Sequence, residues 1–211
     1  MVHRVDAPLL EARSITKSYR RRMVLRDVTL EVRAGEAVAI VGENGVGKST
    51  LARIAAGLLD CDRGFVRVTG RVGYSPQEPD LLDHLTADEH LVLFGRGAGF
   101  GRREALRVGR IALDRVGFPA CEVGIARDLS GGTRQKLNLA LALIGDPPIL
   151  ILDEPYQGFD RGSYLDFWEH VAGWRHEGRA VAIVTHLLAE PERVARTLEL
   201  GRPRTDRVGP R

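Results

Sequence analysis

The sequence predicts an α/β fold in which a mostly parallel sheet is covered on both faces and a wholly helical segment is inserted. Three short apolar runs, at residues 36–41, 147–154 and 180–186, are separated by segments of helical character. Continuous apolar runs of this length are typical of parallel strands buried on both faces. Residues 81–144 show a helical pattern and no strand, so we expect an α-helical subdomain there, between two halves of the α/β core.

Composition and charge indicate a globular chain of 211 residues, with 44% hydrophobic and 28% charged residues. No apolar run approaches the roughly 20 residues that span a bilayer, and the first residues do not resemble a secretion signal. We therefore expect any membrane part to belong to a partner. Cys61 and Cys121 are too few for a disulfide scaffold and indicate a reducing cytosol. The net charge of +3 and arginine clusters without interleaved aromatic residues do not favour nucleic-acid binding.

The first part of the chain alternates apolar and polar residues at 9–16 and 28–32, which predicts half-exposed strands and a β subdomain near residues 9–35. The next strand, 36–41, runs directly into a glycine-rich turn. We assign residues 1–80 and 145–200 to the α/β core, 81–144 to the inserted helical subdomain, and 201–211 to a flexible tail.

Helix boundaries are marked in the inserted segment. Thr86 followed by Glu89 predicts a capping box at a helix start, and Gly117 predicts a helix end. Two apolar faces occur at helical spacing in this segment. One is made by Ala105, Ala112, Leu113 and Val116 before Gly117, and the other by Leu137, Ala140, Leu141 and Ile144 before Gly145.

The stretch GENGVGKS, residues 42–49, fits the phosphate-binding loop pattern, with a strand before it and a helix after it. Its glycines let backbone N–H groups surround phosphates, Lys48 reaches the β- and γ-phosphates, and Ser49 holds Mg²⁺. Thr50 falls near the α-phosphate. The predicted ATP contacts in this loop are Gly42, Asn44, Gly45, Gly47, Lys48, Ser49 and Thr50.

A second motif, LILDEP at residues 150–155, ends a buried strand and carries two neighbouring carboxylates. Asp153 falls at the carboxyl end of that strand, where ligands bind in open α/β sheets, and is predicted to hold Mg²⁺. Glu154 is predicted to orient and deprotonate the attacking water.

A second glycine-rich turn, LSGG at residues 129–132, opens another helix. A helix N-terminus with free N–H groups is an anion site, so a second phosphate contact is expected far from the first loop.

With these motifs in this order, the chain resembles the nucleotide-binding subunit of ATP-binding-cassette (ABC) transporters over about residues 9–200. LSGG is the signature of that family. The resemblance implies a P-loop NTPase (RecA-like) core, an N-terminal antiparallel β subdomain and an inserted α-helical signature subdomain. It also implies ATP hydrolysis with Mg²⁺.

The resemblance implies four further roles. Tyr19, expected on an edge strand, matches the aromatic residue that stacks on adenine, and Gln77 matches the glutamine that senses Mg²⁺ and the attacking water. Asp160 matches the aspartate that links two subunits. His186 matches the histidine that contacts the γ-phosphate.

The chain departs from the family in two places. Tyr156-Gln157-Gly158-Phe159-Asp160 stands where the family commonly has Thr-Ser-Gly-Leu-Asp, and Thr133-Arg134-Gln135 follows the signature. The second variation resembles the drug- and lipid-export branch.

The mechanism implied by the resemblance needs two chains. Ser130, Gly131 and Gly132 of one chain bind the γ-phosphate of ATP held by the other, in a homodimer or heterodimer attached to a membrane permease at the cytoplasmic face of the membrane. The alternative is a soluble ABC-type ATPase without a permease, acting on a nucleic-acid, ribosomal or cofactor-assembly partner. Tandem-cassette translation factors and coiled-coil repair proteins need more chain than 211 residues, so we expect transport.

Overall fold

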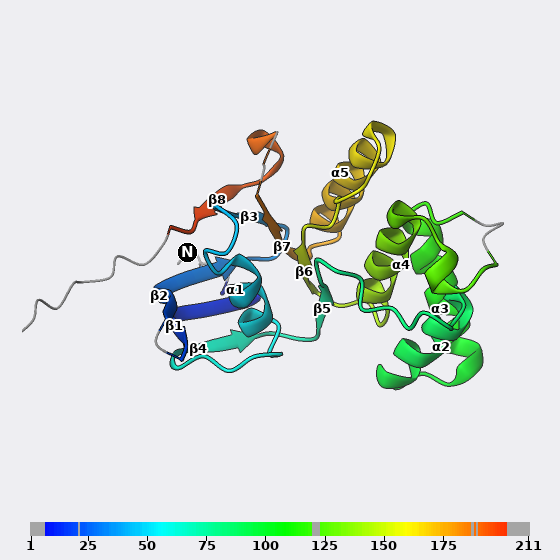
Figure 1. Cartoon of the computed structure of the whole chain (residues 1–211), viewed down its shortest axis with the longest axis horizontal. Helices are drawn as coiled ribbons and strands as arrows, with labels where there is room; N and C mark the ends of the chain where they lie inside the picture. The colour runs from blue at the N-terminus through cyan, green and yellow to red at the C-terminus, as the bar shows by residue number, and fades with distance from the viewer. Residues whose placement is uncertain (1–6, 21, 120–122, 187, 189, 202–211) are drawn as a thin grey trace, which may run out of the picture.

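The computed structural model describes residues 7–20, 22–119, 123–186, 188 and 190–201 (Figure 1). The strands are β1 (Leu10–Tyr19), β2 (Arg22–Val32), β3 (Ala37–Val41), β4 (Arg63–Val68), β5 (Val72–Ser75), β6 (Ile149–Asp153), β7 (Ala180–Thr185) and β8 (Arg196–Glu199). The helices are α1 (Lys48–Ala55), α2 (Ala87–Gly97), α3 (Arg102–Arg115), α4 (Gly131–Leu143) and α5 (Arg161–His176), with 3₁₀ turns at Ala126–Asp128 and Pro191–Arg193. Cys121 and residues 202–211 of the predicted tail lie outside the described residues.

The central sheet has the strand order β5-β6-β7-β3-β8, and all of its neighbouring strands are parallel. Successive side chains enter two different cores: Ile151 and Ala182 face one, Leu150 and Ile183 the other. Both faces are therefore buried, which explains why β3, β6 and β7 read as unbroken apolar runs and confirms the mostly parallel sheet predicted from them.

The smaller sheet is antiparallel, with the order β2-β1-β4. β1 is its central strand, so the expectation that Tyr19 lies on an edge strand is wrong. The third strand, β4, was not predicted, because only Val66 of its side chains is even partly buried. Helix α1 lies between the two sheets, in contact with β1 on one side and with β6 and β7 on the other.

Helices α2, α3 and α4 pack together at the end of the molecule opposite the smaller sheet (Figure 1). The capping box is confirmed: the Glu89 N–H donates to the Thr86 hydroxyl, and the Thr86 N–H donates to the Glu89 carboxylate. Gly117 follows α3 with a φ of 63°, a left-handed conformation that favours glycine. Among the described residues no helix is both long and apolar enough to cross a bilayer.

Helix α5 lies between two of the predicted strands, where a helical segment was expected, although its bounds were not predicted, and it contributes most of an aromatic cluster beside the carboxyl end of β6. The Tyr156 ring makes edge contacts with Tyr164 and Phe167 at centroid distances of 5.2 and 5.4 Å, and lies 6.2 Å from Trp168. Trp174 packs on Phe167 about two turns further along the helix. These side chains anchor α5 on the face of the central sheet that α4 also covers.

Gly73 in β5 provides a stability test, because the end of α4 crosses this strand without room for a side chain. A Cβ there would lie 2.1 Å from the Ala142 carbonyl oxygen and 2.8 Å from Pro147. We expect Gly73→Ala to lower the free energy of unfolding by about 1–3 kcal/mol, measured by urea denaturation. Gly97→Ala is the control, since its Cβ meets nothing within 4 Å. Equal stability of the two variants would contradict the close approach.

Candidate functional site

A cavity of 520 Å³ lies where the phosphate-binding loop, the end of β6 and the first strands meet. It brings together segments that are more than a hundred residues apart in sequence. Its lining residues are Tyr19, Arg22, Val24, Asn44, Gly45, Gly47, Lys48, Ser49, Thr50, Gln77, Asp153 and Glu154.

Lys48 begins α1 and is buried, with 7% of its surface exposed. Its ammonium donates to the carbonyl oxygens of Gly42 and Glu43, at 2.7 and 3.1 Å. These bonds hold the loop closed around the lysine. Because an ammonium has three N–H donors, these two bonds leave one for a ligand in the cavity.

Gly47, just before α1, has a φ of 111°. A Cβ on it would lie 2.8 Å from side-chain atoms of both Val24 and Leu25. Strand β2 therefore packs closely against the phosphate-binding loop at Gly47. This is also why Arg22 and Val24 line the cavity, a contact that the sequence motifs did not indicate.

Asp153 ends β6 at the floor of the cavity and is 1% exposed. Burial raises the pKa of its carboxyl group, and the neighbouring Glu154 raises it further, whereas a hydrogen bond with Ser49 and the charges of Arg53 and Lys48 act in the opposite direction. Its Oδ1 has no hydrogen-bond partner among the described residues. A buried carboxylate oxygen without a partner is costly, so this atom and the nearby Ser49 hydroxyl fit a hydrated cation.

Glu154 follows β6 with a φ of 48°, a left-handed conformation that turns its side chain away from the strand. Its N–H donates to the Val184 carbonyl at 2.9 Å. His186 Nδ1 lies 2.9 Å from Oε1, and the Thr185 hydroxyl donates to Oε2 at 3.3 Å. Because a carboxylate only accepts, Nδ1 carries the proton of that contact. The glutamate is 5% exposed and held at both oxygens.

Gly42 and His186 do not line this cavity. They line an adjacent hollow of 650 Å³, to which Asn44 also contributes. The two hollows therefore share the edge of the phosphate-binding loop. The predicted contact of His186 with the γ-phosphate stays a prediction.

The signature turn lies outside both hollows. Ser130 is the N-cap of α4, and its hydroxyl accepts a hydrogen bond from the Thr133 N–H at 3.2 Å. Ser130 and Gly131 are exposed, and Gly132 approaches the Gly158 carbonyl in the loop after Tyr156. Their N–H groups thus face outward at the start of a 13-residue helix.

Asp160 caps α5, accepting from the Ser163 N–H at 2.8 Å, and this hydrogen bond lowers the pKa of the carboxyl group. Its predicted role in linking two subunits is not tested by this contact. The structure assigns it one function, helix capping, that the sequence comparison did not indicate.

Helix α4 is also joined by side-chain hydrogen bonds to segments beside the cavity of its own chain. Gln135 donates to the Glu154 carbonyl at 3.4 Å, and Asn138 donates to the Ser75 hydroxyl and the Pro76 carbonyl, each at 2.9 Å. Both side chains are buried. The helix that carries the signature turn is thereby attached to the backbone at Glu154 and to the segment before Gln77.

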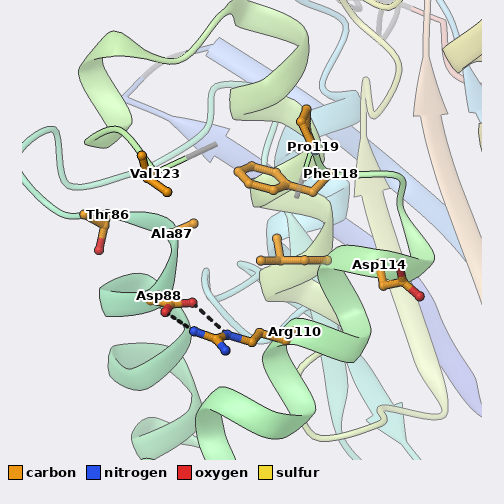
Figure 2. A pocket seen from close by; sticks show the side chains of 9 residues that line it. Thr86, Ala87, Asp88, Arg110, Asp114, Phe118, Pro119 and Val123 are labelled. Atoms are coloured by element: carbon orange, nitrogen blue, oxygen red, sulfur yellow. Dashed lines mark hydrogen bonds and ion pairs between the residues drawn. The ribbon is translucent and has the colours of Figure 1, made fainter. Parts of the chain in front are cut away.

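A separate hollow of 520 Å³ lies in the helical subdomain, between the start of α2 and the end of α3 (Figure 2). Arg110 forms a two-pronged ion pair with Asp88 across it, at 3.2 and 2.5 Å. Phe118 and Val123 form an apolar rim, and Val123 is 84% exposed.

Comparison with known proteins shows what this chain is similar to. A family model described as ABC transporter matches residues 25–157. Nod factor export ATP-binding protein I of Sinorhizobium fredii is 34% identical over 198 residues, covering 88% of this chain and 57% of that protein. The chain spans 57–64% of the lengths of this relative and two like it. An ABC transporter ATP-binding protein of Methanocaldococcus jannaschii is 30% identical, covering 89% of this chain and 71% of that protein.

Solved structures give the same result. An ATP-binding subunit of an ABC transporter superposes with a TM-score of 0.80 at 31% identity, over 92% of this chain and 87% of that chain. A dimeric bacterial ABC transporter cassette gives a TM-score of 0.84 at 24% identity, over 92% and 95%, which shows the fold. A family model that matches more than half of the chain, together with a relative at 30% identity of which the chain covers 71%, shows that the chain belongs to the ABC transporter family and is an ATP-binding cassette.

Proposed function

We propose that the chain is the ATP-binding and ATP-hydrolysing subunit of an ABC transporter, and that it drives export through a separate permease. The observation that carries this proposal is the convergence of Lys48, the buried Asp153 and the doubly held Glu154 in one cavity. A cation, a metal-binding carboxylate and a general base are the groups that phosphoryl transfer to water requires.

Each group has a role in the proposed reaction. Lys48 binds the β- and γ-phosphates, and Tyr19 stacks on the adenine. Ser49, Asp153 and Gln77 hold Mg²⁺, directly or through water. When bound, Mg²⁺ neutralises charge on the phosphates and acts as a Lewis acid.

Glu154 accepts the proton of the attacking water. Its carboxylate is suited to this because Thr185 and His186 fix both oxygens in place. His186 stabilises the γ-phosphate from the adjacent hollow.

A second chain completes each ATP site. Ser130, Gly131 and Gly132 lie outside the cavity that holds Lys48, so they serve the ATP of the partner chain, and a two-fold arrangement makes this exchange reciprocal. Asp160 contacts the partner across the interface. ATP binding closes the pair, and hydrolysis removes the γ-phosphate contacts and opens it.

The permease docks at the hollow in the helical subdomain (Figure 2). Its rim is apolar at Phe118 and Val123, and Asp88 neutralises Arg110, so a loop with an apolar side chain fits it. The chain then acts at the cytoplasmic face of the membrane. The names of the Nod factor export relatives support export as the direction.

Ser130→Arg tests the shared site. We expect hydrolysis to fall by about 10²-fold, because the bulky side chain blocks donors aimed at the γ-phosphate. ATP binding to the isolated chain, measured with a fluorescent nucleotide, should stay nearly unchanged. Equal loss of binding in the monomer would contradict a site shared between chains.

Mixing two inactive variants sharpens this test. Lys48→Ala lacks the phosphate-binding lysine but keeps Ser130, and Ser130→Arg has the reverse defect. In a mixed dimer one composite site is intact, so ATPase activity should reappear when the two proteins are combined. Failure to recover activity, with mixed dimers shown by tag capture, would contradict the head-to-tail arrangement.

The transport assignment is tested by tagging the chain in its native cell, solubilising membranes in detergent and identifying the protein that co-purifies. We expect a multi-span permease. Recovery of ribosomal, nucleic-acid or cofactor-assembly partners, with no permease, would favour a soluble ATPase instead.

A further inference from the structure

Asn138 is a polar residue in an otherwise apolar stretch of α4. Residues 137–144 read LNLALALI, and every other side chain in that run is apolar. Asn138 is nonetheless buried, and so is Ser75 at the end of β5. Burying a side-chain amide costs free energy unless the amide is hydrogen-bonded, so packing alone does not explain an asparagine at this position.

Both hydrogens of the Asn138 amide have an acceptor. Nδ2 donates to the Ser75 hydroxyl oxygen and to the Pro76 carbonyl oxygen, each at 2.9 Å. A carbonyl oxygen only accepts, so the NH₂ end of the amide must face Pro76. The partners therefore determine the orientation of the side chain, and the two bonds join α4 to the two residues that precede Gln77.

The Pro76 carbonyl belongs to the peptide group that leads into Gln77. Because a peptide group is planar, holding its carbonyl oxygen also fixes the direction of the Gln77 N–H and the position of the Gln77 Cα. Gln77 itself is exposed and lines the cavity that contains Lys48 and Asp153. The hydrogen bond from α4 thus acts one peptide group away from a residue of the ATP site.

Helix α4 is held firmly on the strand that leads to Gln77. One turn beyond Asn138, the Ala142 carbonyl oxygen comes so close to Gly73 that a Cβ there would lie 2.1 Å away. Gly73 and Ser75 are alternate residues of β5 and so lie on one face of it. In the other direction along the helix, the N-cap Ser130 lies about 12 Å from Asn138. The signature turn and the hydrogen bond to Pro76 therefore belong to one rigid helix.

We propose that Asn138 is a positioning residue for ATP hydrolysis, which fixes the peptide group before Gln77 and thereby places the Gln77 side chain at the Mg²⁺ site. The inference rests on the proposed function, in which Ser49, Asp153 and Gln77 hold Mg²⁺. Asn138 does not line the cavity, so it acts through Pro76 and Gln77 rather than by touching the nucleotide. The helix whose first turn serves the partner's ATP thus also sets a metal-binding residue of its own site.

Asn138→Leu keeps a buried side chain of similar size and removes both N–H donors. We expect the Kd of the complex of Mn²⁺ with a non-hydrolysable ATP analogue, measured by calorimetry, to rise about three- to tenfold, the effect of one hydrogen bond. The Kd of the metal-free analogue, measured with a chelator present, should stay unchanged because Lys48 and its loop are intact. The ATPase kcat should fall to a similar extent. An unchanged Kd of the metal complex would overturn the inference.

Two controls separate positioning from packing. Leu141→Ala removes buried apolar atoms from the same helix but leaves both bonds of Asn138, so it should lower the melting temperature without a selective loss of the metal complex. Ser75→Ala removes one acceptor and keeps the bond to Pro76, so it should bind the metal complex as the wild type does. If either control reproduces the selective loss, the peptide group before Gln77 is not the point of action and the inference fails.

A double-mutant cycle with Gln77→Ala tests the last step. If Asn138 acts through the Gln77 side chain, Asn138→Leu should cause no further loss of metal-complex binding in the Gln77→Ala chain. Losses that multiply would show that the two residues act independently and would overturn the inference. If thermal melting shows that Asn138→Leu does not fold, Asn138→Ala replaces it, because the smaller side chain leaves room for a water at the Pro76 carbonyl.

Failure of the proposed function gives a different result. A wild-type chain that binds neither the metal complex nor the metal-free analogue contradicts the ATP site itself. A wild type that binds and hydrolyses ATP, together with an Asn138→Leu variant that binds the metal complex equally well, overturns only the positioning role.

Discussion

Lys48→Ala should abolish nucleotide turnover. The lysine is the buried cation of the cavity, and its ammonium bonds to the carbonyls of Gly42 and Glu43. Its removal deletes the charge predicted to bind the β- and γ-phosphates and leaves these carbonyls without their donor. We expect phosphate release to fall by about 10²-fold or more, together with a large loss of affinity for ATP. Normal hydrolysis by this variant would refute the assignment of the site.

The control for this variant is Lys136→Ala. Lys136 also donates to a backbone carbonyl, that of Gly117 at 3.1 Å, but it lies on α4 outside the cavity. Its nucleotide affinity should match that of the wild type. Thermal melting of both variants without ATP separates a binding defect from unfolding.

Glu154→Gln should separate binding from hydrolysis. The amide has the shape of the carboxylate but cannot accept the proton of the attacking water, so we expect hydrolysis to fall by about 10²–10⁴-fold while ATP still binds. Because the γ-phosphate contacts then persist, an ATP-bound dimer should accumulate and elute earlier in gel filtration. Glu104→Gln, which alters only an exposed ion pair with Arg107 on α3, should hydrolyse ATP normally.

A Glu154→Gln chain that stays monomeric with ATP would contradict pairing of identical chains. Purification of the wild-type complex from its native cell then shows whether a different cassette is the partner. If hydrolysis is unimpaired, Glu154 is not the base, whatever the oligomeric state.

The parts of the fold that could be predicted are those whose sequence pattern reflects complete burial. β3 is apolar throughout, and β6 and β7 are apolar up to their last residues, Asp153 and Thr185, because both faces of the central sheet are covered. β4 and β8 are mostly exposed and β5 alternates buried with partly buried residues, so none of them is an unbroken apolar run, and they form because neighbouring strands pair with them. Helix α5 mixes polar and aromatic residues without a clear face, so periodicity did not indicate its bounds.

The candidate site likewise combines residues that local sequence motifs predicted with residues that they did not. Motifs close in sequence, such as Lys48 and Ser49 or Asp153 and Glu154, predicted which residues gather in the cavity. Contacts made across neighbouring strands left no local pattern. Arg22 reaches the cavity only because β2 packs behind the loop, and Thr185 meets Glu154 only through the register of β6 and β7.

The aromatic cluster on α5 gives the protein its own optical reporter. Trp168 and Trp174 are the only two tryptophans in the sequence, and both are buried on one helix. All fluorescence excited at the red edge of the absorption band therefore comes from α5, whose Trp168 lies 6.2 Å from the ring of Tyr156. We expect tryptophan fluorescence to report nucleotide binding, and the proposed closure of the pair, in the unlabelled wild-type chain, at the helix that Asp160 caps.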